Sequence, residues 1–221
     1  MGRPSGGYKL DGERIPGVTT IAGLLKDAAP LMWWSWDCGM KGLDYRQVRD
    51  DAASAGTCLH DMIEEDWHGK PFDRSKYDEA MLAKADHAFL SYLAWKSQTN
   101  LKVVKAEVSL VSRKHRFGGT MDCLLVGGEL TIGDWKSSSH VYPEMLIQVA
   151  GGYSLLYEEA YPDDPPLTGM HLLRFSKPKD PNDPISFSAH YWSAEIFPIA
   201  QRQFLLLREA YDLQKRLKGL V

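Results

Sequence analysis

Residues 117–136 read FGGTMDCLLVGGELTIGDWK, and this stretch decides how the chain folds. Apolar residues alternate with other residues on both sides of a Gly-Gly-Glu turn. This period of two predicts two antiparallel strands, over residues 117–126 and 130–136, joined as a hairpin. A further alternating run over residues 102–111 predicts a third strand before them.

The length of the turn decides which face of the sheet each charged residue occupies. A two-residue turn would send Asp122 to the face opposite Asp134, because a shift of one residue moves a side chain to the other face. A three-residue turn over residues 127–129 would pair Val126 with Leu130 and Asp122 with Asp134. We favour the longer turn because it matches apolar residues inside the hairpin and gathers charge at its open end.

The same face gains two more charged residues. Lys136 follows Asp134 by two positions, so both side chains point the same way. A turn centred on residues 113–114 would pair Glu107 with Thr120 and bring Glu107 close to Asp122. We expect helices to cover the other face, which carries Val104, Ala106, Val108, Leu110, Phe117, Met121, Cys123 and Leu125.

Two carboxylates that face each other across a sheet repel, so a bridging cation is the natural reason to keep them. Oxygen ligands favour Mg²⁺ or Mn²⁺, and a nearby lysine stabilises an attacking hydroxide or the charge that develops on a phosphate. A solvated strand end with a surface Asp–Lys pair would explain Asp134 and Lys136 alone. It does not explain the acids Asp122 and Glu107 beside them, and the pattern therefore indicates metal-assisted phosphodiester hydrolysis.

The rest of the chain predicts one domain over residues 1–221. Residues 1–7 should be disordered, residues 8–100 mainly helical, and residues 101–221 a sheet core with a C-terminal helix. A short hairpin should form at Asp11-Gly12, and Thr19 or Thr20 should cap the helix that follows. The remaining expected elements are helices over 44–68, 74–98, 142–160 and 194–218 and strands over 168–175 and 185–192. This order predicts an α/β fold with a mixed β-sheet flanked by helices.

Composition limits the classes of protein that the chain can belong to. The 221 residues, 44% hydrophobic and 25% charged, suit a soluble globular domain, and no apolar run is long enough to span a bilayer. The three cysteines are far apart and unpaired in sequence, which argues against zinc ribbons and disulfides and fits a cytoplasmic protein. The net charge of -3 gives no support for nucleic-acid binding, although a bound cation would supply positive charge locally.

Four motifs occur in the order seen in PD-(D/E)XK nucleases, and the chain resembles the RecB-like branch with its phage-type exonucleases. They are GTCLHDMIE (56–64), GGTMDCLL (118–125), IGDWKSS (132–138) and IQVAGGY (147–153). The resemblance implies a restriction-endonuclease-like core and a Mg²⁺- or Mn²⁺-dependent deoxyribonuclease, with an exonuclease favoured. It also implies a bacterial host cytoplasm, linear duplex or single-stranded DNA ends as substrate, and an annealing recombinase as a possible partner. The alternatives are a structure-specific or nicking endonuclease and a non-catalytic DNA-binding module.

The resemblance also implies a role for each matching residue. Asp122, Asp134, His60 and the backbone carbonyl of Trp135 would hold the metal. Lys136 would activate water, with Glu107 among the catalytic acids and Glu64 supporting His60 from the same helix face. Gln148 and Tyr153 would form the glutamine–tyrosine motif, and the residues expected to contact DNA are Ser137, Ser138, Arg174, Lys177 and Lys179.

Three features leave alternatives open. Gln148 and Tyr153 are five residues apart, one more than usual, so either Gly151 and Gly152 absorb a residue or Tyr153 lies elsewhere. The two glycines indicate either a close approach of the helix to the sheet or DNA, or a helix that begins late or breaks. The stretch LMWWSWDCGM (31–40) could stack DNA bases, but a packed core is the favoured interpretation. The cysteine set of the iron–sulfur relatives is missing, so we expect no iron–sulfur cluster.

Overall fold

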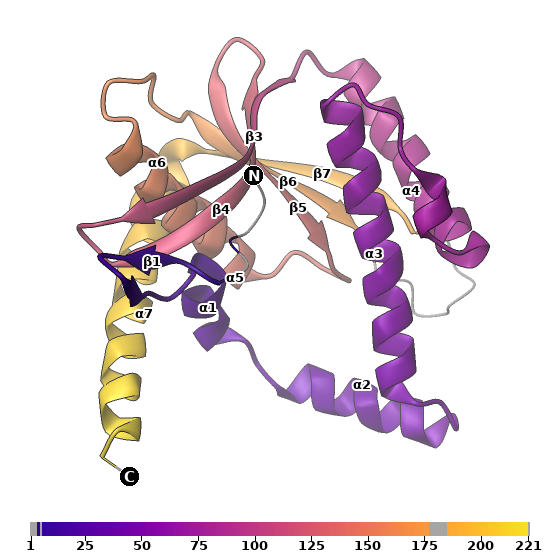
Figure 1. The fold of residues 1–221 in the computed structure, drawn as a ribbon, viewed down its shortest axis with the longest axis horizontal. Coiled ribbons are helices and arrows are strands. Elements are labelled where there is room, and N and C mark those ends of the chain that lie inside the picture. Colours follow the sequence, from indigo (N-terminus) through magenta and orange to yellow (C-terminus); the bar gives the residue numbers. More distant parts are fainter. Residues whose placement is uncertain (1–3, 5, 177–184, 221) are drawn as a thin grey trace.

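A mixed five-stranded sheet forms the centre of the protein (Figure 1). The computed structural model describes residue 4, residues 6–176 and residues 185–220. The strands lie in sequence order: β3 (Lys102–Ser112), β4 (Phe117–Val126), β5 (Leu130–Ser137), β6 (Gly169–Phe175) and β7 (Phe187–Ser193). Only β5 and β6 pair in parallel, because a helical crossover joins them, while the other neighbours are antiparallel. The predicted α/β class with a mixed sheet is confirmed.

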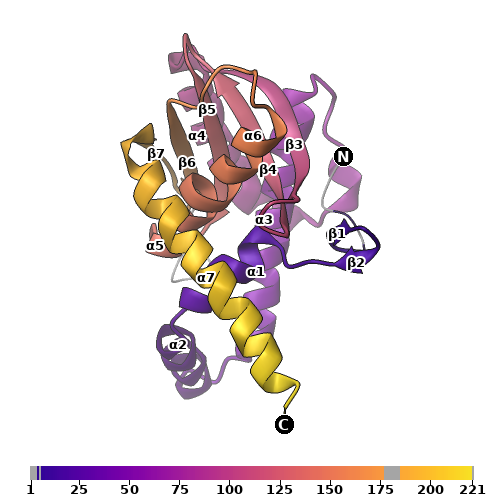
Figure 2. The same ribbon diagram turned by 90° about the vertical axis from the view of Figure 1, so that its left-hand side faces the viewer.

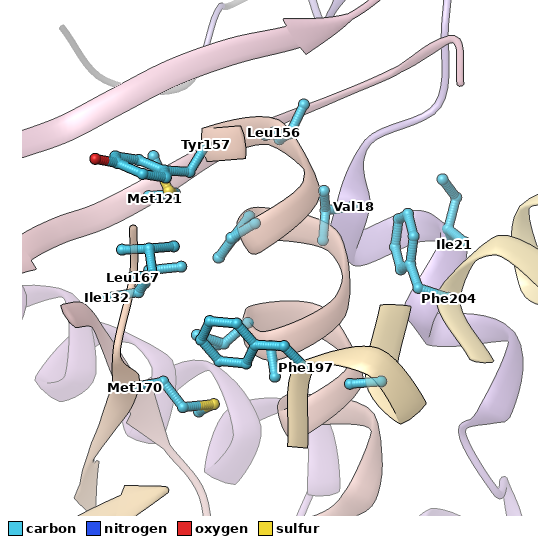
Figure 3. Close-up of a cluster of buried hydrophobic side chains, with 14 of the residues drawn as sticks. Val18, Ile21, Met121, Ile132, Leu156, Tyr157, Leu167, Met170, Phe197 and Phe204 are labelled. Carbon is cyan, nitrogen blue, oxygen red and sulfur yellow. The ribbon is translucent and has the colours of Figure 1, made fainter. Parts of the chain in front are cut away.

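Helices cover both faces of the sheet (Figure 2). One face packs against α1 (Val18–Ala22), α5 (Pro143–Leu146), a π-helical segment (Ile147–Tyr153), α6 (Ser154–Ala160) and α7 (Phe197–Lys218). The other packs against α3 (Tyr45–Trp67) and α4 (Glu79–Gln98). Figure 3 shows the first core, in which side chains of α1 and α7 meet the sheet. Asp44 and Asp78 cap α3 and α4 by accepting backbone N–H groups, as short acidic side chains do at helix starts.

The predicted hairpin register is confirmed along the paired part of β4 and β5. Val126 lies opposite Leu130, Leu124 opposite Ile132 and Cys123 opposite Gly133. The turn has three residues, and Gly128 adopts a φ of 102°, which a residue without a side chain adopts at little cost. The carboxylates of Asp122 and Asp134 therefore come next in the register.

The predicted register between β3 and β4 is wrong by two residues. The turn has four residues, 113–116, so Ser109 rather than Glu107 lies opposite Thr120. A shift of two preserves the face, and the register carries Glu107 to the position facing Asp122. Glu107 has a φ of 50°, a left-handed conformation that a non-glycine residue rarely adopts.

The apolar face predicted for β3 and β4 is not continuous. Met121 and Leu124 both pack into the core under α1 and α7, although they are three residues apart. Cys123 and Leu125 lie instead against the side of β5 where Gly133 would carry a Cβ atom. The alternation of faces is therefore interrupted at Asp122. Val104 of β3, which was predicted to lie on the apolar face, is 53% exposed.

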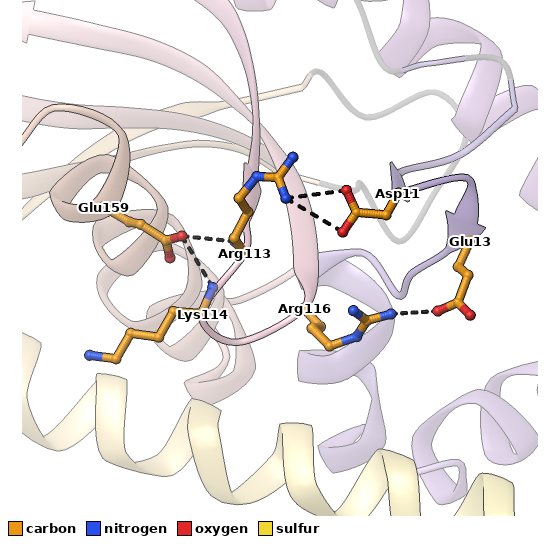
Figure 4. A network of polar contacts seen from close by, with 6 residues as sticks. All are labelled: Asp11, Glu13, Arg113, Lys114, Arg116 and Glu159. Atoms are coloured by element: carbon orange, nitrogen blue, oxygen red, sulfur yellow. Dashed lines mark hydrogen bonds and ion pairs between the residues drawn. The ribbon is translucent and has the colours of Figure 1, made fainter.

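The turn between β3 and β4 is held from two sides (Figure 4). The Glu159 carboxylate of α6 accepts hydrogen bonds from Ser112 Oγ at 2.5 Å and from the backbone N–H of Arg113 at 2.8 Å and Lys114 at 3.2 Å. The N-terminal hairpin of β1 (Lys9–Leu10) and β2 (Glu13–Arg14), which turns at Asp11-Gly12 as predicted, adds ion pairs from Asp11 to Arg113 and from Glu13 to Arg116. These exposed pairs add little stability, so Glu159 is the main anchor.

Several N-terminal predictions need correction. Gly17, not Thr19 or Thr20, precedes α1, and it makes no side-chain cap. The helix predicted over 74–98 is a single 3₁₀ turn at Arg74–Lys76 followed by α4. The expectation for residues 1–7 falls largely outside the described residues.

The tryptophan-rich stretch forms α2 (Ala29–Met40), and its interpretation as packed core is wrong. Trp33 is 68% and Trp36 56% exposed, and their rings contact each other edge to face. On the opposite side of α2, Cys38 is buried and Trp34 contacts Tyr45 of α3. Apolar content alone predicts burial, but α2 presents more apolar surface than its single neighbouring helix covers. Among the described residues, no helix is long and apolar enough to cross a membrane.

Candidate active site

The pairing of β4 with β5 ends at Cys123 and Gly133, and a side chain continues it. The carboxylate of Asp122 accepts a hydrogen bond from the backbone N–H of Trp135 at 2.8 Å. In an extended strand, the N–H and C=O of one residue point to the same side. The Trp135 carbonyl therefore points to the same side as Asp122, and its role as a metal ligand stays a prediction.

The side chain of Trp135 lies on the other side of the sheet, in the core. Its ring packs against Trp67 of α3 at 4.9 Å, Tyr92 of α4 at 5.4 Å and Phe175 of β6 at 5.8 Å between centroids. The buried indole fixes the position of β5, and it thereby fixes the direction of the two charged side chains beside it. A rigid strand is a suitable support for a catalytic group.

Asp134 and Lys136 form a close ion pair on the face of β5 that carries Ile132. The Asp134 side chain is buried, while that of Lys136 keeps 18% of its surface exposed. The ammonium contacts Oδ2, and Oδ1 has no hydrogen-bond partner among the described residues. A buried carboxylate with unused acceptor capacity is costly unless a cation completes its surroundings.

Electrostatics point in the same direction. Burial raises the pKa of Asp134 to about 7, with a further increase from Asp122, while Lys136 lowers it. Burial also raises the pKa of Asp122, against the opposing effects of Lys136 and the Trp135 N–H. Two carboxylates share one ammonium in a dry place, so the site carries a deficit of positive charge. A divalent cation would remove that deficit.

The donor set fits a hard divalent cation. Asp122, Asp134 and the Trp135 carbonyl supply only oxygen, and Mg²⁺ is ordinarily bound by one or two carboxylates with several waters and substrate phosphates. In the part of the chain that the structure describes, no group of three or more His, Cys, Asp or Glu side chains is arranged to hold a metal ion. The two carboxylates and the backbone carbonyl are therefore the donors that the site offers to a cation, and water or a phosphate oxygen would have to complete its coordination.

His60 reaches the site from α3. Burial lowers the pKa of His60, Lys136 lowers it further, and Asp134 opposes the shift. The imidazole is therefore neutral at neutral pH, which is the form that binds metals. Its role as a ligand stays a prediction.

Glu64 lies one turn further along α3 and is half exposed. Burial and then the charge of Glu107 raise the pKa of Glu64, and His68 pairs with it at 3.8 Å. Glu107 also acts on the pKa of Asp122 and His60. This cluster of acids, together with the left-handed backbone of Glu107, is typical of a functional site.

Gln148 and Tyr153 come together despite their wide spacing. The Gln148 amide nitrogen donates to the Tyr153 hydroxyl at 2.8 Å, and both side chains are buried. A π-helix bonds residues five apart, so the segment Ile147–Tyr153 absorbs the extra residue. Asp134 and Asp122 both raise the pKa of Tyr153, after the larger effect of burial, which places the ring beside the acids.

The helix that contains this segment is continuous from Pro143 to Ala160, so it neither begins late nor breaks. Gly151 and Gly152 allow neighbouring helices to pack closely against it. A Cβ atom on Gly151 would lie 2.6 Å from the Ala200 carbonyl oxygen of α7, and one on Gly152 would lie 2.5 Å from a Val18 methyl carbon of α1. Within the protein, the close approach is to neighbouring helices and not to the sheet.

The loop after β5 is held by hydrogen bonds. Ser138 is buried, and its hydroxyl donates to the His140 carbonyl at 2.8 Å. Arg174 donates to the carbonyls of Ser138 and Ser139, both at 3.0 Å. Ser137 lies beside Gly56 of α3. Contacts of Ser137, Ser138 and Arg174 with DNA stay predictions, and Lys177 and Lys179 lie outside the described residues.

Sequence reasoning missed the anchoring role of Arg174. Its signal was present in the parallel pairing of β5 with β6, which sets Arg174 beside Lys136. Sequence reasoning also missed the Trp135 N–H as a donor to Asp122. No residue type marks a backbone group, so only the register could have shown it.

Comparisons with known proteins give weak likenesses. No family model and no curated protein matches the chain. Similar solved structures include the alkaline exonuclease LHK-Exo from Laribacter hongkongensis, alone and in complex with dAMP, each at 14% identity and a TM-score of 0.33 over 77% of this chain and 92% of that one. The protein SSO0001 has 11% identity and a TM-score of 0.28 over 72% of this chain and 74% of that one. At these TM-scores the likeness supports no argument about activity, so the case for function rests on the site.

Proposed function

We propose that this protein is a Mg²⁺- or Mn²⁺-dependent deoxyribonuclease, and more narrowly an exonuclease. The observation that carries the proposal is the pair of neighbouring carboxylates, Asp122 and Asp134, each of which feels the charge of Lys136, with Lys136 in contact with Asp134. Holding two like charges close together away from water costs free energy. Hydrolysis of a phosphodiester is a reaction that uses both the cation that these carboxylates attract and the lysine beside them.

The residues divide the work between them. Asp122, Asp134 and the Trp135 carbonyl would hold the cation, which would supply charge stabilisation for the phosphate. Lys136, released from Asp134, would orient the attacking water and stabilise the negative charge that develops on it and on the phosphate. Tyr153, whose hydroxyl accepts a hydrogen bond from Gln148, would position a phosphate oxygen. His60 and Glu64 would close the site from α3.

The exonuclease assignment, the phage or prophage type and a role in DNA recombination, repair or end processing follow from the order of the four sequence motifs. The same resemblance supports a bacterial host cytoplasm as the location and a single-strand annealing recombinase as a partner. An endonuclease and a non-catalytic DNA-binding module are the competing functions. The acids and the lysine are all present and close together, which favours an enzyme.

A cleavage assay tests the proposal. End-labelled linear duplex, single-stranded DNA and closed circular DNA are incubated with Mg²⁺, Mn²⁺ or EDTA. We expect loss of linear DNA only, abolished by EDTA and by Lys136→Ala, while Lys114→Ala on an exposed turn cleaves like the wild type. Cutting of circular DNA would establish the endonuclease, and binding without cleavage in either metal would exclude an enzyme.

Metal binding has a test that does not depend on cleavage. Titration calorimetry should detect Mn²⁺ binding to the wild type. Asp122→Asn should weaken it at least tenfold, because one of two charged ligands is lost. Equal affinity in both proteins would remove Asp122 from the metal site.

A further inference from the structure

Helix α7 carries a long apolar stripe that the described part of the chain leaves at least half exposed. Its members on the helix are 50–73% exposed: Ile199, Leu206, Leu213 and Leu217. Leu220, which is 81% exposed, follows just after the end of the helix. The buried side of the same helix is separate and consists of Phe197, Ala200, Phe204, Leu207 and Arg208. Figures 1 and 2 both show the second half of α7 extending beyond the sheet. Exposed apolar rows of this length on a helix indicate a binding surface.

The spacing of the stripe identifies the kind of partner. Steps of four and three alternate without a break through Ile199, Gln203, Leu206, Ala210, Leu213, Leu217 and Leu220. This is the seven-residue repeat of a coiled coil, with leucine at every seventh position from residue 206 to residue 220. The occupant that fits such a stripe is another α-helix with the same repeat.

We propose that two copies of this chain dimerise through α7 as an antiparallel two-helix coiled coil. One register aligns the apolar rows: Leu206 meets Leu217 of the partner subunit, and Ala210 meets Leu213 of the partner subunit. The charges that flank the stripe then match. Glu209 faces Arg216 of the partner subunit, and symmetry repeats that pair, so the contact is bordered by two ion pairs.

A parallel arrangement lacks these pairs. There Glu209 would face Gln214 of the partner subunit, and each Gln203 and Ala210 would meet its own copy in the middle of the seam. An antiparallel coil also sets the two sheet domains at opposite ends of the contact, because each domain holds only the first half of its α7. Leu206, Leu213 and Leu217 of each copy would form the apolar centre of the contact.

The contact leaves the active sites free. The part of α7 that packs against the π-helical segment is its first turns, near Ala200 and Phe204, whereas the coil uses residues 206–217. Each copy therefore keeps a complete site, and dimerisation and cleavage can be measured separately.

Sedimentation velocity over a range of concentrations tests the proposal. We expect a dimer for the wild type and a monomer for the double variant Leu213→Glu, Leu217→Glu, in which solvated carboxylates replace side chains that are 50% and 63% exposed in their own chain. Leu90→Glu, at a leucine of α4 that is 65% exposed, is the matched control and should remain dimeric. A monomeric wild type at the highest soluble concentration, or a dimeric double variant, would overturn the proposal.

Charge exchange tests the orientation. Glu209→Arg and Arg216→Glu alone should each weaken the dimer roughly tenfold, and the two together should restore it, because both ion pairs reverse at once. Cysteines placed at Ala210 in one copy and Leu213 in the other should cross-link with each other. Cross-linking of Ala210→Cys with itself, together with silent charge exchanges, would show a parallel coil and refute the antiparallel register.

Discussion

Replacing Gly151 with alanine should destabilise the protein, although glycine is normally the worse residue in a helix. The exchange ordinarily gains about 1 kcal/mol from helix propensity. Here the new Cβ atom would lie 2.6 Å from the Ala200 carbonyl oxygen and 3.0 Å from Phe204 Cβ. A backbone oxygen cannot rotate away, so α7 must move, and overpacking of this kind costs about 1–3 kcal/mol. At the upper end of that range the net loss is about 2 kcal/mol.

Thermal unfolding followed by circular dichroism measures this loss. For a chain of this size we expect the melting temperature to fall by about 4–8 °C. The matched control is Gly39→Ala in α2, where nothing lies within 4 Å of the new atom, and it should be neutral or stabilising by up to about 1 kcal/mol. If Gly151→Ala were as stable as the wild type, the tight contact between the π-helical segment and α7 would be refuted.

Three further substitutions probe the supports of the site. Tyr153→Phe removes the hydroxyl that accepts a hydrogen bond from Gln148, and it should lower the free energy of unfolding in urea by about 1–2 kcal/mol. The rate of DNA cleavage should fall by a larger factor than this loss of stability explains. An unchanged cleavage rate would exclude Tyr153 from the site. Arg208→Met removes hydrogen bonds to two carbonyls of the β3–β4 turn and should cost about 1–3 kcal/mol, whereas a variant as stable as the wild type would contradict that anchor. Glu159→Gln should cost about 1 kcal/mol at neutral pH, measured by the same unfolding experiment at several pH values. If the carboxylate is unimportant, the loss of stability caused by Glu159→Gln should be the same at every pH.

The pH dependence of the Glu159 effect has a definite sign. Burial raises the pKa of Glu159, but hydrogen bonds from Ser112 and from the N–H groups of Lys114 and Arg113 outweigh it, so the pKa lies below its usual value. The charged form is the one stabilised by folding. The difference between wild type and variant should therefore be complete above the ordinary carboxyl pKa of about 4.3 and disappear as the pH falls through the lower folded value.

The sequence predicted the β4–β5 hairpin well because two independent signals agreed. Apolar pairs matched only in the register that also gathered Asp122 and Asp134 at the open end, and the structure has that register as far as the pairing extends. The β3–β4 turn offered no such check. Residues 113–116 are charged or polar whichever of them form the turn, so the register could slip by two without exposing an apolar residue.

The periodic pattern of apolar residues could not predict two features of the structure. The interruption at Asp122 breaks a rule on which strand prediction depends, namely that side chains alternate between faces. Glu107 in a left-handed conformation is part of that interruption, and nothing in its residue type announces it. The exposure of α2 escaped prediction for a different reason, since a helix can be amphipathic toward a partner that is not in the same chain.

The π-helical segment shows how packing decides what spacing alone leaves open. At 3.6 residues per turn, residues five apart point roughly 140° away from each other, so an α-helix would separate Gln148 from Tyr153. The additional residue turns Tyr153 back toward Gln148 only because the helix widens, and a widened turn loses regular packing. Gly151 and Gly152 allow α7 and Val18 to press against that turn and hold it. The position of the tyrosine beside the two acids therefore depends on a helix that begins more than forty residues later, which explains why the motif could be found in the sequence but its geometry could not.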